Sequence, residues 1–414
     1  MPSPFARLGC RAHSPSLLGR WLGTVGLTLA ACLPSVPVPA AEVEVSTVFS
    51  YPNHDPYDRS NLYGLSHAPS VAVMPDGRLL VVWWAGPFEG SLDQVILGAN
   101  SADGGRTWSA ARSMANLTGV KHLSQWDPAL ISGKDATWLF FALGRLNPYP
   151  AVGGSMPGMR VINQEDYGVG TNAFRVYVQK SADSGSSWSR AAPAVPQPCI
   201  CRNNGIVLRN GAMLLPVYFL TSQVSVVGPP VDSRFFASVL RSDDQGVTWK
   251  RLGRVQGLQG IAGDEPTIAE LDDGSVLMTM RSSDGHAWFS QSHDGGATWT
   301  EAKPSEFEAA KSSHALYRTR AGRILFAYNA CSTYLRSPLV LRVLNQKDMT
   351  WSQPVKLAEM LPPATDDKVW FRQVCYPSIT ELSDGTALVV WTEIKYSELE
   401  QTGRIRSARV RGIN

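Results

Sequence analysis

Short apolar runs separated by turn signals fill the chain from about residue 60 onward, and the same order of features recurs six times. Each unit has an apolar run, a turn with Asn-Gly, Asp-Gly or a related pair, and a second apolar run. The turn glycines are Gly77, Gly133, Gly211, Gly274, Gly322 and Gly385. Sustained apolar periodicity of 3.6 residues is absent beyond the N-terminal region. The pattern therefore predicts an all-β protein with almost no helix.

A second repeat, Ser-x-Asp-x-Gly-x-Thr/Ser-Trp, interleaves with the first. Four copies end at Trp108, Trp188, Trp249 and Trp299, and a degenerate fifth copy ends at Trp351. The Asp carboxylate accepts nearby backbone N–H groups and the Gly supplies a positive φ, so each copy predicts a tight hairpin turn. We expect these Asp boxes to be structural, with the Trp packed against its own sheet.

Four short strands per unit and six units predict a six-bladed β-propeller over residues 41–414. We expect a monomer in which the segment 405–410 closes the ring, by pairing with the first blade or within the sixth. Two longer gaps, between residues 144 and 174 and between 221 and 234, predict loops that shape a substrate site.

The first 40 residues have the features of an export signal. Three Arg residues precede an apolar run at positions 21–31, and Val38-Pro39-Ala40 suits an ordinary signal peptidase. Leu29-Ala30-Ala31-Cys32 instead resembles a bacterial lipobox, in which Cys32 carries a lipid anchor. We favour the ordinary cut, and expect a periplasmic or secreted protein; the alternative is a lipoprotein at the outer membrane.

The charge balance excludes several partners. Three of the 38 basic residues lie in the first 40 positions, which leaves 35 basic against 35 acidic residues. A near-zero net charge argues against a nucleic-acid binder and against a polybasic membrane-surface protein. Cys199, Cys201, Cys331 and Cys375 lack the partners of a metal site, so we expect no metal and no cofactor. We interpret at least two of them as buried thiols, although a Cys331–Cys375 bridge remains an alternative.

Polar residues recur at the start of the first strand of each unit. Alignment of the six copies on their proline or its equivalent places six residues at the same height: Ala68, Asp127, Asn204, Glu265, His314 and Tyr376. The first strand of each blade lies nearest the propeller axis, so these side chains are predicted to meet at one end of the channel. Five polar groups at such a point favour a functional site over a merely water-filled channel.

Four Asp boxes on six units, together with the sequence Asp-Glu265-Pro-Thr-Ile-Ala-Glu-Leu-Asp-Asp-Gly, resemble the sialidase (neuraminidase, BNR-repeat) superfamily over roughly residues 60–410. The resemblance implies that Tyr376 is the nucleophile and that Glu265 takes the phenol proton. It implies that Arg281 and Arg336 bind the substrate carboxylate. For the acid/base in the loop before the first box, Asp93 is the first candidate and Glu89 the second.

The residue types suit this chemistry. Sialic acid carries a carboxylate on its anomeric carbon, so an anionic Asp nucleophile would be repelled, whereas a Tyr hydroxyl is neutral until it attacks. Its ordinary pKa of about 10 requires a base beside it, which Glu265 can supply. Arg281 and Arg336 can hold one carboxylate through charge-assisted hydrogen bonds. Asp127, Asn204 and His314 are expected to contact the substrate or to support the site.

One position departs from the family. The first carboxylate-binding Arg of sialidases stands in a Tyr-Arg-Ile-Pro motif, where this chain has Ser66-His67-Ala68-Pro69. With an ordinary pKa of about 6.5, His67 is expected to become charged as the pH falls and then to strengthen the binding of a carboxylated sugar. Related propellers with a His in the site include uronate-specific polysaccharide lyases and rhamnosyl-uronate hydrolases.

Three functions are therefore carried forward. The first is an exported exo-glycosidase that removes a terminal acidic sugar from a glycan. The second is an enzyme on a uronate, either a hydrolase or a lyase that uses His67 and Tyr376 as acid and base. The third is a non-catalytic propeller that binds glycans.

Overall fold

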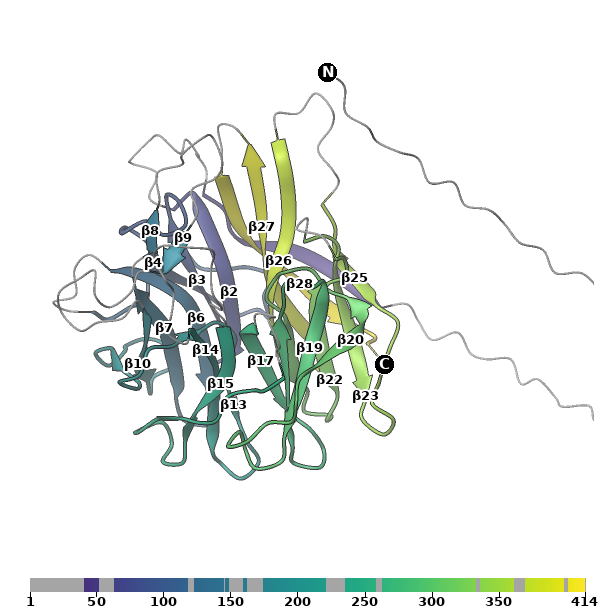
Figure 1. Cartoon of the computed structure of the whole chain (residues 1–414). Helices are drawn as coiled ribbons and strands as arrows, with labels where there is room; N and C mark the ends of the chain where they lie inside the picture. The colour runs from purple at the N-terminus through teal and green to yellow at the C-terminus, as the bar shows by residue number, and fades with distance from the viewer. Residues whose placement is uncertain are drawn as a thin grey trace, which may run out of the picture. The chain divides into compact units, whose positions relative to one another are not determined.

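The computed structural model describes eleven stretches of the chain: residues 41–51, 63–117, 123–144, 146–148, 159–161, 174–220, 235–257, 263–332, 336–360, 369–397 and 401–413. Every regular element in these stretches is a β-strand (Figure 1), as the sequence predicts. None of them forms a helix long and apolar enough to cross a membrane. The predicted export signal, including Cys32, and most of the two predicted loops lie outside the described residues.

Four sheets of four or five strands form separate blades. The first of these separate blades, which is formed by the second sequence repeat, holds β6 (Ser124–Ser132), β7 (Thr137–Gly144), β10 (Phe174–Ser181) and β11 (Ala192–Pro193). The next holds β12 (Ile200–Cys201), β13 (Ile206–Val207), β14 (Met213–Leu220), β15 (Phe235–Ser242) and β16 (Lys250–Arg251). The third holds β17 (Asp264–Glu270), β18 (Val276–Arg281), β19 (His286–Ser292) and β20 (Lys303–Glu308). The fourth holds β21 (Ala315–Arg318), β22 (Ile324–Asn329), β23 (Leu339–Asn345), β24 (Thr350–Trp351) and β25 (Val355–Ala358). A small extra pair consists of β8 (Leu146–Pro148) and β9 (Met159–Val161).

The first and last sequence repeats share one eight-stranded sheet, so four separate blades are found instead of the six predicted. This sheet holds β1 (Glu42–Phe49), β2 (Leu65–Val73), β3 (Leu79–Gly86), β4 (Val95–Ser101), β5 (Arg112–Ser113), β26 (Val369–Glu381), β27 (Ala387–Ser397) and β28 (Gln401–Arg411). The two repeats join because β2 and β28 pair in parallel at Leu65 and Gly403. In Figure 1, the yellow strands β27 and β28 and the purple strand β2 belong to this sheet.

The innermost strands contact one another in a closed sequence: β2 with β6, β6 with β13, β13 with β17, β17 with β21, β21 with β26, and β26 with β2. This closed order is the arrangement of a β-propeller. The predicted closing segment 405–410 belongs to β28, which pairs with β27 of the last repeat.

The apolar runs are continuous rather than alternating because each sheet is buried on both faces. Trp83 and Trp84 on β3 show how this works, since consecutive side chains point to opposite faces of a strand. Trp83 packs in a cluster with Leu388 of the last repeat, and Trp84 packs in a cluster with Leu139 of the second. Burying a large apolar side chain stabilises a fold by roughly 1.5–3 kcal/mol. Packing of apolar side chains between neighbouring sheets therefore stabilises their order around the propeller.

The Asp boxes have the predicted turn chemistry. In the first copy, the Asp103 carboxylate accepts hydrogen bonds from the backbone N–H groups of Arg106 and Thr107 and from the Thr107 hydroxyl. Gly105 has a φ of +85°. Equivalent bonds occur at Asp183, Asp244 and Asp294. These bonds to the charged form lower the pKa of each box carboxyl, which confirms a structural role.

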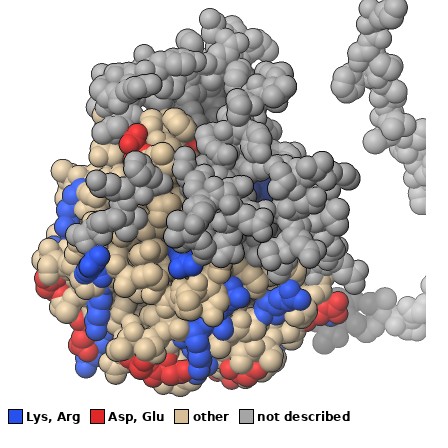
Figure 2. Space-filling view, turned by 60° about the vertical axis from the view of Figure 1, so that its left-hand side comes forward, with Lys and Arg blue, Asp and Glu red and all other residues tan. Residues whose placement is uncertain are grey.

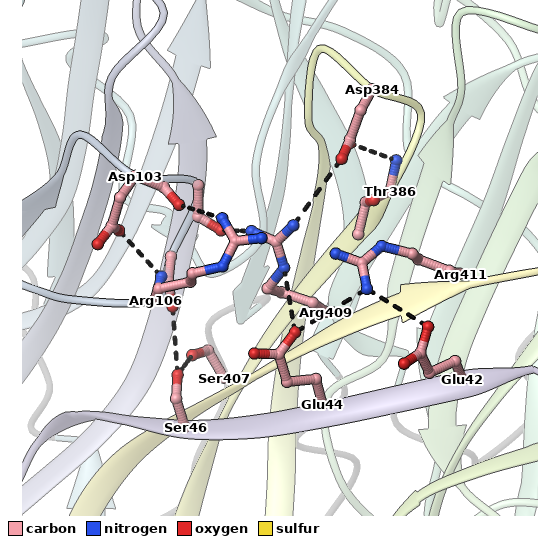
Figure 3. Close-up of polar contacts among 12 residues, drawn as sticks. Glu42, Glu44, Ser46, Asp103, Arg106, Asp384, Thr386, Ser407, Arg409 and Arg411 are labelled. Atoms are coloured by element: carbon pink, nitrogen blue, oxygen red, sulfur yellow. Dashed lines mark hydrogen bonds and ion pairs between the residues drawn. The ribbon is translucent and has the colours of Figure 1, made fainter.

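The N-terminal strand β1 pairs antiparallel with β28. Charged side chains fasten it (Figure 3): Arg409 on β28 lies 3.6 Å from Glu44, and Arg411 lies 3.4 Å from Glu42. Arg409 also donates to the carbonyl of Gly104 in the first Asp box at 2.6 Å. The sequence analysis did not predict this strand. Its pairing with β28, together with the bond from Arg409 to Gly104, joins β1, the last strand and the first repeat.

On the face shown in Figure 2, neither sign of charge dominates among the described residues. The described Lys and Arg side chains there lie among described Asp and Glu side chains. This mixture agrees with the near-zero net charge after residue 40. Any affinity for an anionic ligand must therefore come from individually placed cations.

Candidate functional site

The inner strands share a backbone irregularity at the positions that the repeat alignment singled out. Ala68, Asp127, Glu265 and Tyr376 each have a positive φ, between 44° and 59°. At each of them the register with the neighbouring strand shifts. Such conformations cost about 1–3 kcal/mol each for non-glycine residues and occur often at functional sites. The bulges redirect the backbone at equivalent heights of four inner strands, as the alignment predicted.

Three of the predicted site residues form a hydrogen-bonded triangle. The Tyr376 hydroxyl donates to Oε1 of Glu265 at 2.8 Å. Arg281, at the end of β18, donates from Nη1 to the same Glu265 oxygen at 2.8 Å and to the Tyr376 hydroxyl at 2.8 Å. Tyr376 and Glu265 are both buried. The structure therefore brings together a phenol, a carboxylate and a guanidinium that come from three separate strands.

The electrostatics give each member of the triangle a defined charge. Burial opposes the ionisation of Glu265, but the charge and hydrogen bond of Arg281 outweigh it, so the pKa of Glu265 lies below its ordinary value. Burial raises the pKa of Tyr376 well above 10, even though Arg281 and Arg336 oppose this shift. Glu265 is thus an anion beside a neutral phenol, which is the arrangement required of a base and a nucleophile.

Two further guanidiniums approach the ring of Tyr376. Arg336 lies 5.3 Å from the ring centroid, measured from its guanidinium carbon, and Arg202 lies 5.0 Å from it. Arg336 is held by donating from Nε to the carbonyl of Lys311 at 3.1 Å and from Nη1 to Oε1 of Gln373 at 3.4 Å. Arg336 thus belongs to the site, as predicted. Arg202 was not predicted.

His67 also contacts the nucleophile candidate, but it is not a cation. Its ring lies 4.2 Å from the ring of Tyr376 and 5.3 Å from that of Trp84, between centroids. Burial, followed by the charges of Arg336, Arg202 and Arg281, lowers the pKa of His67 well below 6.5. The expectation that His67 becomes charged in mild acid is therefore wrong. Its buried Nδ1 has no hydrogen-bond partner among the described residues.

Of the two acid/base candidates, the structure places Glu89 rather than Asp93 against the cluster. Glu89 is half-buried in the turn between β3 and β4, and Asp93 is exposed to solvent. Burial raises the pKa of Glu89, with Glu265 adding to the effect and Arg336 and Arg281 opposing it. A raised pKa lets a carboxyl keep its proton to a higher pH, which suits a group that donates a proton to a leaving group.

The remaining predicted residues differ in their surroundings. Asp127 is buried, and burial raises its pKa to about 7. Burial lowers the pKa of His314 to about 3, and its Nδ1 lies 3.4 Å from the hydroxyl of Thr279. Asn204 uses its amide for the scaffold, because Oδ1 accepts from the Leu130 N–H and Nδ2 donates to the Val71 carbonyl. Asn204 is therefore a structural residue rather than a substrate contact.

The sequence analysis missed three groups at the site. Arg202 and Asp264 are buried beside it, and Asp264 lies opposite Arg281 in the strand register, with Oδ1 3.9 Å from Nε. Burial raises the pKa of Asp264 to about 6. Tyr218 is buried, which raises its pKa well above 10, and the charges of Asp127 and Glu265 add to this. A signal did exist for Arg202, because it begins the polar run Arg202-Asn203-Asn204, which ends at an aligned channel position.

The cysteines are not part of this chemistry. Cys199, Cys201 and Cys375 are buried, and neither Cys375 nor Cys331 forms a disulfide in the described structure. Burial raises the pKa of Cys199 to about 12 and that of Cys375 to about 11. The interpretation as buried thiols is confirmed for these residues. Within the described stretches, no group of three or more His, Cys, Asp or Glu side chains is arranged to hold a metal ion.

A β-propeller with a buried Tyr–Glu–Arg cluster at its inner strands and the adjacent strand β18 is sialidase-like, and known structures have the same fold. The structure of a Dyadobacter fermentans protein of unknown function matches with a TM-score of 0.65 at 19% identity, over 90% of this chain and 99% of that one. A Hadza microbial sialidase matches with a TM-score of 0.65 at 18% identity, over 86% of this chain and 68% of that one.

A family model described as the BNR repeat-like domain matches residues 77–389, and the chain belongs to this family. A curated sialidase of Micromonospora viridifaciens is 27% identical over 362 residues, which are 80% of this chain and 50% of the relative. The chain thus spans about half the length of that relative. The resemblance to a sialidase-like BNR-repeat protein is confirmed.

Proposed function

We propose that the protein is a retaining exo-glycosidase that removes a terminal acidic sugar, such as sialic acid, from a glycan. The observation that supports this most directly is the triangle of Tyr376, Glu265 and Arg281, because it pairs a neutral nucleophile with an ionised base. A neutral nucleophile suits a substrate whose reacting carbon carries a carboxylate.

In the first step, the Tyr376 oxygen attacks the anomeric carbon while its proton passes to Glu265. The bond to the leaving oxygen breaks, and Glu89 donates the proton that this oxygen requires. In the second step, Glu89 takes a proton from the attacking water, the bond between Tyr376 and the sugar breaks, and Glu265 returns its proton to Tyr376. Two displacements at one carbon retain its configuration.

The substrate carboxylate meets two side-chain cations in this proposal. Arg281 bonds to the hydroxyl of the reacting phenol and Arg336 lies over its ring, and guanidinium forks suit a planar carboxylate. Neutral His67 stands where the family has a third cation, so the carboxylate is held less tightly than three Arg residues would hold it. Stacking of the sugar against His67 and Tyr376 is a further contribution.

A screen of purified protein tests this function. The glycans are sialosides and uronate polysaccharides, and Tyr376→Phe is the matched control, since it keeps the ring and removes only the hydroxyl. Release of a free acidic sugar by the wild type and not by the control supports the proposal. Binding of a glycan without turnover would instead identify a glycan-binding propeller.

A uronate lyase is the second candidate, favoured by the 4.2 Å approach of neutral His67 to Tyr376. In that reaction, one of the two removes the proton beside the uronate carboxylate. The glycosidic C–O bond then breaks, and the other protonates the leaving oxygen. The lyase product is an unsaturated uronate that absorbs in the ultraviolet, whereas hydrolysis gives no such product. Ultraviolet absorbance of the products therefore distinguishes the two candidates.

We also propose that the protein is exported and that the eight-stranded sheet represents two blades of a six-bladed ring. Support for six blades comes from the six sequence repeats and from the single parallel pair, Leu65 with Gly403, that joins the two halves of this sheet. Export predicts a mature N-terminus at Ala41, or at an acylated Cys32, and mass spectrometry of the protein from its native host separates the two. A crystal structure tests the blade count.

A further inference from the structure

One short segment of the second separate blade makes bonds to residues of each of the five remaining sequence repeats. It consists of Cys201, Arg202, Asn203 and Asn204, and runs from the last residue of β12 toward β13. Gly205 follows, and a Cβ there would lie only 2.4 Å from the carbonyl oxygen of Leu214. The glycine therefore allows the segment to pack closely against its own blade while its side chains extend toward the other inner strands.

Arg202 extends furthest. Its guanidinium donates from Nη2 to the carbonyl of Tyr376 at 3.3 Å and from Nη1 to the carbonyl of Pro69 at 3.4 Å. These acceptors lie on β26 and β2, so one side chain bridges the last and first repeats. Arg202 is completely buried and forms no ion pair with a described carboxylate. Burying a cation costs free energy unless hydrogen bonds and nearby charges compensate it, so these two carbonyl bonds are important for holding Arg202 in place.

Asn203 holds the opposite side of the site. Its Nδ2 donates to the carbonyl of Glu265 at 3.2 Å and to that of Pro266 at 3.0 Å. The same nitrogen lies 3.1 Å from the hydroxyl of Ser313, just before β21. Cys201 lies with Sγ 3.3 Å from the carbonyl of Asp127 on β6. Three consecutive residues thus bond to the carbonyls of Asp127, Tyr376 and Glu265.

Those three carbonyls belong to residues with positive φ: 44° for Asp127, 59° for Tyr376 and 47° for Glu265. A strained backbone persists only where its surroundings hold it in place. The bond from Arg202 to Tyr376 and the bond from Asn203 to Glu265 provide such a restraint at the nucleophile and at its base. Both bonds originate from two adjacent residues, so they also tie the two strained residues to each other.

We propose that Arg202 and Asn203 are positioning residues, which set the distance between the phenol of Tyr376 and the carboxylate of Glu265. The proposal rests on the proposed function, in which these two groups exchange a proton. Misplacing reacting groups by about 1 Å can lower a rate by about 100-fold. Neither residue needs to touch the sugar for this effect.

The test uses Arg202→Met, Arg202→Lys and Asn203→Ala in the full-length protein. Thr267→Val is the matched control, because Thr267 is buried and its hydroxyl accepts from the Leu316 N–H of the neighbouring blade rather than bonding to Tyr376 or Glu265. We expect Arg202→Met and Asn203→Ala to lower kcat about 100-fold with little change in KM. Arg202→Lys, which keeps one donor and the charge, should recover part of kcat. Thr267→Val should lower the melting temperature and leave kcat unchanged.

A folded Arg202→Met or Asn203→Ala protein with kcat within threefold of the wild type would overturn the proposal. An equal loss of kcat in Thr267→Val would also overturn it, since any weakened contact between blades would then suffice. If Arg202→Met does not fold, Arg202→Lys and Asn203→Ala carry the test. If the wild type turns over no glycan, the proposed function fails. Crystal structures of Arg202→Lys and Asn203→Ala then test whether the segment positions Tyr376 and Glu265. Retention of the 2.8 Å Tyr376–Glu265 hydrogen bond in both would show that the segment does not position them.

Discussion

The phenol oxygen of Tyr376 lies 2.8 Å from Oε1 of Glu265, although 111 residues separate them in the chain. Each residue precedes a proline on an inner strand, has a left-handed backbone and lies at a strand bulge. Arg281 bonds to both side chains, so one cation stabilises the carboxylate and would stabilise a phenolate as it forms. This relationship is the basis of the following predictions.

Tyr376→Phe should abolish turnover while preserving the fold. The substitution leaves the 2.8 Å pair between Arg281 and Glu265 in place and removes only the hydroxyl. The free energy of unfolding should change by less than about 1.5 kcal/mol, the scale of one net hydrogen bond. Activity assays and urea unfolding measure the two effects. Near-normal activity on the true substrate would exclude Tyr376 as the nucleophile.

Glu89→Gln should lower turnover of natural glycans by roughly 100-fold or more, the range of general acid catalysis. Asp93→Asn is the matched control and should leave activity within a few-fold, because its side chain faces solvent. A substrate with a good leaving group, such as a nitrophenyl glycoside, needs no proton donor for departure, so Glu89→Gln should lose less activity on it. A larger loss in Asp93→Asn than in Glu89→Gln would reverse the assignment.

Asp127→Asn should stabilise the protein at high pH but not at low pH. Burial raises the folded-state pKa of Asp127 to about 7, above its unfolded value of 3.8. The folded state holds this proton more tightly than the unfolded state does, so the contribution of the carboxyl to stability is fully present below the unfolded pKa. That contribution is lost as the pH rises through the folded-state pKa. The variant removes that loss, so its stability relative to the wild type should increase between about pH 4 and pH 7. Urea unfolding at pH 4 and pH 8 compares the two, and a pH-independent difference would contradict the assigned pKa.

The KM of the wild type should show no inflection from His67 between about pH 5 and pH 8, where an ordinary His titrates. Burial and three neighbouring Arg residues lower the pKa of His67 well below 6.5 and so favour the neutral ring. His67→Gln keeps a neutral polar side chain, so its KM should have the same pH dependence as the wild type. An acid-side improvement in KM that disappears in His67→Gln would mean that the imidazole becomes charged and meets the substrate carboxylate.

The sequence by itself determined the repeated strand–turn–strand units, the Asp-box turns and the positions on the inner strands. These features depend on local chemistry: apolar runs, a carboxylate next to backbone N–H groups, and glycines with positive φ. The alignment of Asp127, Glu265 and Tyr376 at one height was also readable, because each stands before the proline of its repeat.

Only the tertiary structure decided which groups meet and what charge they carry. The pairing of Leu65 with Gly403, which merges the first and last repeats, depends on how the ring closes. The choice of Glu89 over Asp93 depends on the path of one turn between β3 and β4. The lowered pKa of His67 and the raised pKa of Asp127 both follow from burial, which depends on neighbours far away in the chain. The bonds of Arg202 are evident only in the folded protein, because its partners Pro69 and Tyr376 are 133 and 174 residues away.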